Sequence, residues 1–375
     1  MGVICKENEL NEIRVPNNDY SFVYSVYRSL FILNKFKNFI LEYKSKSKIN
    51  MGETLKEIFK QNPDIEKNYS IRNSKKILYR IKKEKNSFGL TARSIIIQIL
   101  DLLNKEQIEG KYQSSSDDFA NQDYQIALRG YVESHRLIYF NNKYSELIHG
   151  LLKRQILVNQ HFLYTYECFS YIELNLVDIY NKLSNEGRVF CNSFGVPEIN
   201  LIDAIREEFS SRNSVFGGTQ CIEQKCIHST APYLIFILNN QKKVQEQIYN
   251  YFNIGIFVYG QDLDISCLAE YRENKNKYKI SSIIKEKNIN NNIKNKNNIN
   301  NNINNNINNN NNIINNNNNI YTNNNDHDCK YINNNIDENG QFYYYENNNK
   351  KSGIFNKPGY YDHILIYKHL KDETQ

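Results

Sequence analysis

The chain has 375 residues, of which 40% are hydrophobic and 23% charged, with 29 Tyr, 19 Phe and no Trp. This length allows one large domain or two small ones, and the apolar content is sufficient for a buried core. Its 47 Lys and Arg against 41 Asp and Glu give a net charge of +6, spread along the chain without a concentrated basic block. This charge distribution argues against a dedicated nucleic-acid-binding protein.

The seven cysteines are irregularly spaced, and no secretory signal peptide is predicted. This combination favours reduced thiols over a disulfide framework. No apolar run reaches the roughly 18–20 residues that a membrane span needs. We therefore expect a protein of the cytoplasm or nucleus that has no membrane partner.

The first predicted element covers residues 17–40. Asp19 and Ser21 are suitable N-caps, and apolar side chains recur at helical spacing from Tyr24 to Phe39. The pattern predicts a helix whose apolar stripe faces a core. An N-cap role would by itself account for Ser21.

Helical periodicity continues to about residue 160. The basic segment 75–85 carries apolar residues at helical spacing, which indicates the solvated face of a helix, and Thr91 is a suitable N-cap. The predicted helices cover 51–61, 73–85 and 91–105, with two more within 122–160.

From about Tyr164 the pattern changes toward strands. Residues 233–238 form a continuous apolar run after Pro232, which predicts a strand buried on both faces. Further strands are predicted at 255–258, 278–284 and 364–367.

An Asn-rich tract at 288–325 interrupts this strand region. Such a tract buries too little apolar surface to offset its chain entropy, so disorder is expected. Its position between two predicted strands places it at a loop, where insertions are best tolerated.

Residues 19–30 resemble the nucleophile box of the ubiquitin-specific proteases, whose pattern is Asn-Thr-Cys-Tyr-x-Asn-Ser-x-Leu-Gln-x-Leu. Phe22, Ser25 and Leu30 keep the pattern. Ser21 stands at the position of the catalytic cysteine, and Asp19 replaces the Asn on the oxyanion side.

Two C-terminal segments resemble the remaining boxes of that family. Residues 326–332 keep His327 and a Tyr four residues later from the pattern Gly-His-Tyr-x-x-Tyr. Residues 342–347 resemble Trp-x-x-Phe-Asp/Asn-Asp, with Glu346 followed by Asn347 where the family has the acid or amide that orients the His.

The resemblance implies an α+β, papain-like cysteine-protease fold that covers residues 1–375. The helical, thumb-like lobe would span 1–160, the antiparallel finger and palm part 161–287 and 326–375, and the Asn-rich insertion 288–325. It also implies ubiquitin or a ubiquitinated protein as partner, and hydrolysis of the isopeptide bond at the ubiquitin C-terminus in active relatives.

The site residues predict an impaired enzyme. A serine hydroxyl ionises far less readily than a thiol and needs a well-placed base. The Asp19 carboxylate would put a negative charge where an oxyanion forms. We therefore expect a degenerate deubiquitinase that binds ubiquitin without turnover, and whether any hydrolase activity remains is left open.

Other interpretations of these residues stay open. His327 would be an exposed loop histidine, and Cys5 is an alternative nucleophile with the family's Cys-x-x-Asn spacing. The alternative function is a non-enzymatic interaction or scaffold protein that does not contact ubiquitin.

The cysteines suggest a degenerate structural zinc site, although no cofactor is required. Family members often carry two Cys-x-x-Cys pairs on the finger strands. Here the remaining thiolates would be Cys168, Cys221 and Cys226, completed by His161 or His228. Alternatively, these cysteines pack as small buried hydrophobes.

Overall fold

A computed structural model of the chain describes most of the predicted elements. It covers residues 15, 19–44, 48–61, 70–84, 88–109, 143–193, 195–244, 247–249, 254–257, 262–270, 276–287, 331–337, 339–346, 349–357 and 359–370. The segment 110–142, which contains part of the predicted helical region, and the whole Asn-rich tract at 288–325 lie outside the described residues.

Helices fill the first part of the chain, as their periodicity predicts. The stripe expected over 17–40 is divided between two helices, because the backbone turns at Ile32 and Leu33. Thr91 caps its helix as expected, since its Oγ1 accepts the Ser94 N–H at 3.2 Å. In the described residues no helix has the length and apolarity to cross a membrane. The helices are α2 (Ser21–Phe31), α3 (Asn34–Leu41), α4 (Met51–Gln61), α5 (Ile71–Glu84), α6 (Ala92–Glu109) and α8 (Lys143–Ile148).

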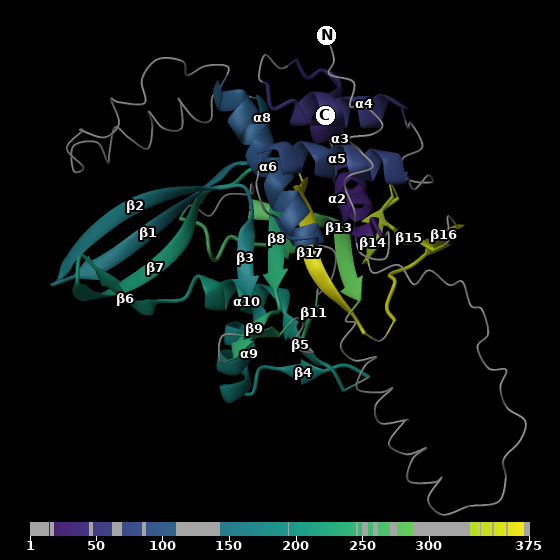
Figure 1. The fold of residues 1–375 in the computed structure, drawn as a ribbon. Coiled ribbons are helices and arrows are strands. Elements are labelled where there is room, and N and C mark those ends of the chain that lie inside the picture. The colour runs from purple at the N-terminus through teal and green to yellow at the C-terminus, as the bar shows by residue number, and fades with distance from the viewer. Residues whose placement is uncertain are drawn as a thin grey trace, which may run out of the picture.

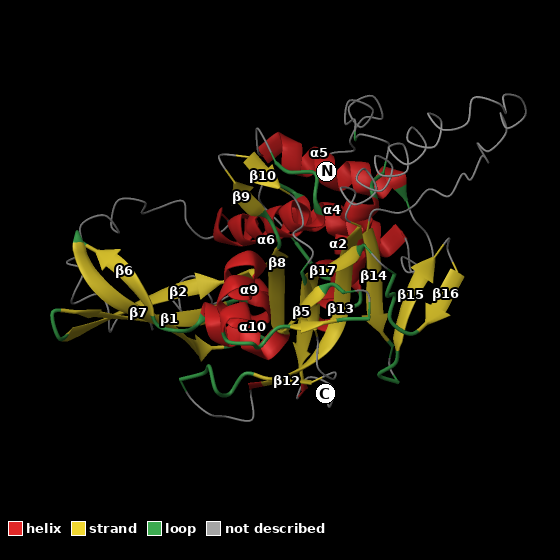
Figure 2. Cartoon of the chain, turned by 90° about the horizontal axis from the view of Figure 1, so that it is seen from below, coloured by secondary structure: helices red, strands yellow, loops and turns green. Residues whose placement is uncertain are grey.

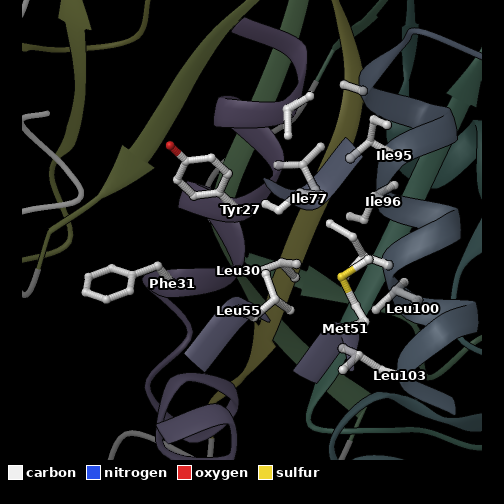
Figure 3. Close-up of a cluster of buried hydrophobic side chains, with 14 of the residues drawn as sticks. Tyr27, Leu30, Phe31, Met51, Leu55, Ile77, Ile95, Ile96, Leu100 and Leu103 are labelled. Carbon is white, nitrogen blue, oxygen red and sulfur yellow. The ribbon is translucent and has the colours of Figure 1, made fainter. Parts of the chain in front are cut away.

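The apolar stripes of these helices meet in one core. Figure 3 shows Leu30 of α2, Leu55 of α4, Ile77 of α5 and Ile96 of α6 pointing toward one another. All four side chains are fully buried. Burial of these apolar side chains, rather than helix propensity, holds the helices in place.

A four-stranded sheet, which we call the finger sheet, projects from one side of the molecule (Figure 1). Its strand at 150–158 lies within 122–160, where two helices were expected. The reason is local: Asn159 and Gln160 both have positive φ, of 48° and 65°, as the tight turn of a β-hairpin requires. In the order β2-β1-β7-β6 its strands are β2 (His161–Phe169), β1 (Gly150–Val158), β7 (Thr219–Ser229) and β6 (Arg212–Phe216).

The central sheet contains the predicted strands 233–238, 278–284 and 364–367. Along its main path the order is β16-β15-β14-β13-β17-β8-β3, and β12 (Asp262–Asp264) pairs with β13. The path consists of β16 (Asn349–Ser352), β15 (Phe342–Glu346), β14 (Tyr331–Ile336), β13 (Lys277–Lys287), β17 (Tyr360–His369), β8 (Tyr233–Asn239) and β3 (Ile172–Asn175).

The two faces of the central sheet bury different cores. In β8, Tyr233, Ile235 and Ile237 pack with the helices α2 to α6. The intervening Leu234 and Phe236 pack on the other face with α9 (Leu176–Asn185) and α10 (Leu201–Glu208), as Figure 2 shows. This alternation is the two-sided burial expected for 233–238. The remaining strands are β4 (Phe190–Cys191), β5 (Pro197–Asn200), β9 (Lys242–Val244), β10 (Gln247–Tyr249) and β11 (Gly255–Phe257).

Candidate functional site

The start of α2 carries the residues that resemble the nucleophile box. Tyr20 is the N-cap, and Ser21 is already the first helical residue. The Ser21 N–H donates to Asp19 Oδ1 at 2.9 Å. The interpretation of Ser21 as an N-cap is therefore wrong, because Asp19 supplies the side-chain acceptor for the helix N-terminus.

The Ser21 side chain is buried. It is 4% exposed, and in the described part of the chain its Oγ has no hydrogen-bond partner. A serine hydroxyl becomes a nucleophile only when a base takes its proton. The predicted base, His327, and the predicted neighbour Asn347 lie outside the described residues.

The ends of two strands lie beside the start of α2. The rings of Phe22 and Tyr331 are 6.3 Å apart, which places the beginning of β14 against the first turn of the helix. Because β14 and β15 are antiparallel, the backbone of Glu346 at the end of β15 lies at the same edge of the sheet. We call this group, Asp19, Ser21, Tyr331 and the Glu346 backbone, the α2 mouth.

A buried polar network fixes α2 to the central sheet below the α2 mouth. Asn333 Nδ2 donates to the Ser25 carbonyl at 3.0 Å and to Ser29 Oγ at 2.6 Å. Ser29 Oγ lies 2.8 Å from Ser282 Oγ, which also donates toward Asn335 Oδ1 at 3.2 Å. Because each donor in this network must meet its acceptor, the hydrogen bonds fix the position of α2 along the sheet.

A cation–π contact adds a second connection between α2 and the sheet. The Arg28 guanidinium lies 4.1 Å from the centre of the Tyr345 ring and is 2% exposed. Tyr24 flanks it at 5.7 Å. A desolvated cation–π contact is worth about 2 kcal/mol, and this one connects α2 with β15.

Two buried pairs of ionisable side chains lie near the α2 mouth, and neither pair was predicted from the sequence. Lys285 Nζ and Asp362 Oδ1 are 2.9 Å apart, and His363 Nε2 and Glu286 Oε2 are 3.7 Å apart. The four ionisable residues lie near the ends of two apolar strands, β13 and β17. Their interruption of each apolar run is the sequence signal that could have pointed to these pairs. Which charge meets which depends on strand register, which the sequence does not reveal.

The finger sheet does not bring two of the predicted zinc ligands together. Cys221 and Cys226 lie five residues apart on β7. An odd spacing in a strand puts side chains on opposite faces, here about 17 Å apart along the strand. The backbone of Cys168 lies in β2, and nothing describes its side chain. Among the described residues there is no group of three or more His, Cys, Asp or Glu side chains suited to a metal ion.

Cys226 belongs to a different cluster. His228 Nδ1 contacts the carboxylate of Glu270, which also accepts from Lys153. Burial, and secondly the Glu270 charge, raise the pKa of the Cys226 thiol. The proton therefore stays on this thiol, which disfavours it as a metal ligand or nucleophile. His161 lies at the other end of the finger sheet, at the turn between β1 and β2.

Solved structures of the SAGA deubiquitinating module share this arrangement of elements. A Ubp8 variant with Sgf11, Sus1 and Sgf73 matches 98% of this chain and 71% of its own, with TM-score 0.57 and 12% identity. The fold is ubiquitin-specific-protease-like. The same module bound to ubiquitin aldehyde matches 94% of this chain and 68% of its own (TM-score 0.52, 12% identity). A yeast module with an Sgf73 variant matches 93% and 66% (TM-score 0.52, 12% identity). No protein-family model and no curated protein sequence matches the chain.

Proposed function

We propose that this ubiquitin-specific-protease-like protein binds ubiquitin, or a ubiquitinated protein, without hydrolysing the isopeptide bond. The proposal includes a papain-like arrangement in which α2 is the nucleophile helix and the α2 mouth is the former catalytic centre. The cysteines at 191, 221, 226 and 267 are all free, in keeping with a reducing cytoplasmic or nuclear setting.

The hydrogen bond between the Ser21 N–H and Asp19 carries this proposal. In acyl transfer, backbone N–H groups at a helix N-terminus stabilise the oxyanion of the tetrahedral intermediate. Here the N–H of the nucleophile position already donates to a carboxylate, 2.9 Å away. An incoming oxyanion would meet both an occupied donor and a like charge.

The exposed face of the finger sheet supports the binding part of the proposal. Strand register places Phe162, Leu157 and Ile222 opposite one another on one face. Phe162 is 53% exposed and Ile222 46%. Tyr164, two residues along β2, lies on the same face and is 40% exposed. Exposed apolar side chains gathered in this way are typical of protein-binding surfaces.

Two measurements on the whole protein test the proposal. Isothermal titration with free ubiquitin should detect binding, and incubation with ubiquitin bearing a C-terminal electrophile should give no covalent adduct. An adduct would contradict the loss of catalysis. Absence of both binding and labelling would contradict the connection with ubiquitin.

Paired substitutions locate the binding surface. Phe162→Ser combined with Ile222→Ser should weaken ubiquitin binding about tenfold or more, the effect of losing one hot-spot contact. Phe190→Ser is the matched control, because Phe190 is 67% exposed on β4, in a different sheet. Equal affinities for the two variants would exclude the finger sheet as the contact.

The same exposed face fits the alternative function, a non-enzymatic scaffold that contacts a protein other than ubiquitin. The isothermal titration distinguishes the two functions. A scaffold of this kind would show no binding of free ubiquitin, although its finger sheet is folded.

A further inference from the structure

One outer edge of the finger sheet is formed by β2, a strand of nine residues. Among the described strands only β1 pairs with it, and Figure 1 shows β2 along the outside of the projecting sheet. Its sequence, HFLYTYECF, contains neither Pro nor Lys, and its pairing with β1 has no bulge. Proteins usually protect edge strands with these devices, because an open edge can accept a further strand.

The other outer strands of the two large sheets are protected. The strands β6 and β3 contain five and four residues, and β16 contains four, of which two are Lys. Short edge strands and Lys both oppose the addition of another strand. In the described part of the chain, β2 is therefore the outer strand best suited to pairing with a strand from another molecule.

The hairpin turn determines which residues of β2 face the open edge. The loop between β1 and β2 has two residues, so Val158 and His161 on either side of it exchange backbone hydrogen bonds. Hydrogen-bonded and non-hydrogen-bonded pairs then alternate along an antiparallel ladder. Phe162 and Tyr164 fall in non-hydrogen-bonded pairs, so their N–H and C=O groups point away from β1, toward the open edge.

The same two residues carry exposed aromatic side chains. Phe162 is 53% exposed and Tyr164 40%, and their rings are stacked with centres 6.5 Å apart. An antiparallel second copy of β2, with the two-fold axis at Leu163, would place Phe162 of each chain opposite Tyr164 of the other. Aromatic pairs across neighbouring strands stabilise a sheet. In this register His161 would face Thr165, so no like charges would be opposed.

We propose that β2 is a dimerisation edge, at which two copies of this chain join their four-stranded finger sheets into one continuous sheet. Each pair of Phe162 with Tyr164 exchanges both of its backbone hydrogen bonds across the interface. The interface is isologous, because the same segment serves both chains. Pairing uses the backbone edge and leaves the exposed face of the finger sheet open, so the dimer is independent of ubiquitin binding.

The size of the contact predicts a weak dimer. Only residues 161–165 of each copy pair in this register, and a contact of this size belongs to the weak, transient class of interfaces. Sedimentation of the full-length wild type at increasing protein concentration should show the mass rising from monomer to dimer. A monomer at every concentration up to the limit of solubility would overturn the proposal.

Removal of one backbone donor at this edge tests the pairing itself. Tyr164→Pro deletes an N–H that points away from β1, a position at which edge strands tolerate Pro. The dimer loses this hydrogen bond in both copies, so its dissociation constant should rise about tenfold or more.

Val215→Pro is the matched control. Val215 follows the same geometry on the opposite edge of the sheet, because it lies one pair beyond the two-residue turn between β6 and β7 and its N–H points away from β7. Its substitution should leave the dissociation constant of the dimer unchanged. An unchanged dissociation constant in Tyr164→Pro, or an equal rise in both variants, would overturn the proposal.

A cross-linking experiment remains decisive if Tyr164→Pro does not fold. At the two-fold axis the two Leu163 Cα atoms would be about 4.5 Å apart, which is within the range for a disulfide. Leu163→Cys should therefore form a covalent dimer with an added thiol oxidant, above the background of the wild type with its seven native cysteines.

Thr165→Cys is the control for this experiment, because it lies on the same face of β2 and its two thiols would be about 14 Å apart along the strands. Equal cross-linking of Leu163→Cys and Thr165→Cys would overturn the proposed pairing.

Discussion

Asp19 accepts a hydrogen bond from the backbone at the start of α2. Its carboxylate takes the first free N–H of α2, next to the buried hydroxyl of Ser21. The sequence alone places Asp19 and Ser21 at the start of a helix, and their assignment to the oxyanion-side and nucleophile positions stays a prediction. It did not predict the hydrogen bond between Asp19 and Ser21, because side-chain direction at a helix start depends on the cap geometry, and the residue types suggested Ser21 as the cap.

A thiol placed at Ser21 would report on this carboxylate. In Ser21→Cys, the Asp19 charge raises the thiol pKa and occupies the oxyanion donor, so the ubiquitin electrophile should react slowly. Adding Asp19→Asn should accelerate labelling about tenfold or more. The substitution removes the charge that raises the thiol pKa, an effect of about one pKa unit, and it frees the backbone donor for the oxyanion. The wild type, with its seven native cysteines, is the background control. Equal labelling rates with Asp19 and Asn at this position would contradict the assigned role.

At the scale of elements, helix α2 is held by polar contacts as well as by its apolar stripe. Asn333 joins it to β14 through Ser25 and Ser29. Four buried polar side chains in the middle of a packed interface are unusual, because each must find a partner. They specify how α2 lies on the sheet, and hence where Ser21 is held.

Removing Asn333 should therefore cost more than an ordinary surface change. Asn333→Ala leaves the buried Ser25 carbonyl and Ser29 hydroxyl with fewer partners, for an expected loss of about 1–3 kcal/mol in the free energy of unfolding. Urea denaturation measures it. Asn339→Ala, at an exposed turn, should change stability by less than about 0.5 kcal/mol. A loss for Asn333→Ala no larger than for Asn339→Ala would contradict the role of the network.

Sequence patterns predicted elements well where periodicity was strong. The helices at 51–61, 73–85 and 91–105 and the strand at 233–238 were found because their apolar residues recur at one period over many positions. Two helices were expected within 122–160, and the strand at 150–158 was not predicted, because the turn at Asn159 and Gln160 lacks the Asn-Gly signal of a hairpin. The pairing of His363 with Glu286 was out of reach, because a bulge changes register without a recognisable residue pattern.

At the scale of the molecule, the central sheet contributes side chains to two cores, one on each of its faces. Ile237 faces the core shared with α2 to α6, and Leu238 faces the core shared with α9 and α10. Neither core is complete without the sheet, so loss of packing on one face is expected to destabilise the other.

Two neighbouring substitutions in β8 test this coupling. Ile237→Ala and Leu238→Ala should each lower the free energy of unfolding by about 2–5 kcal/mol and keep a single transition. Far-ultraviolet circular dichroism and tyrosine fluorescence should give coincident curves. Val215→Ala, at a side chain 66% exposed, is the control. Separate transitions for the two probes would show that the cores unfold independently.

The pairing of β13 with β14 has a consequence for the length of the segment that joins them. Glu286 lies opposite Tyr331, so the chain leaves the sheet after residue 287 and re-enters it at residue 331 at nearly the same point. Doubling the length of a flexible connection adds only about 0.6 kcal/mol to the cost of closing it. The number of residues in this connection can therefore change at little cost in free energy, while the paired strands that flank it stay in register.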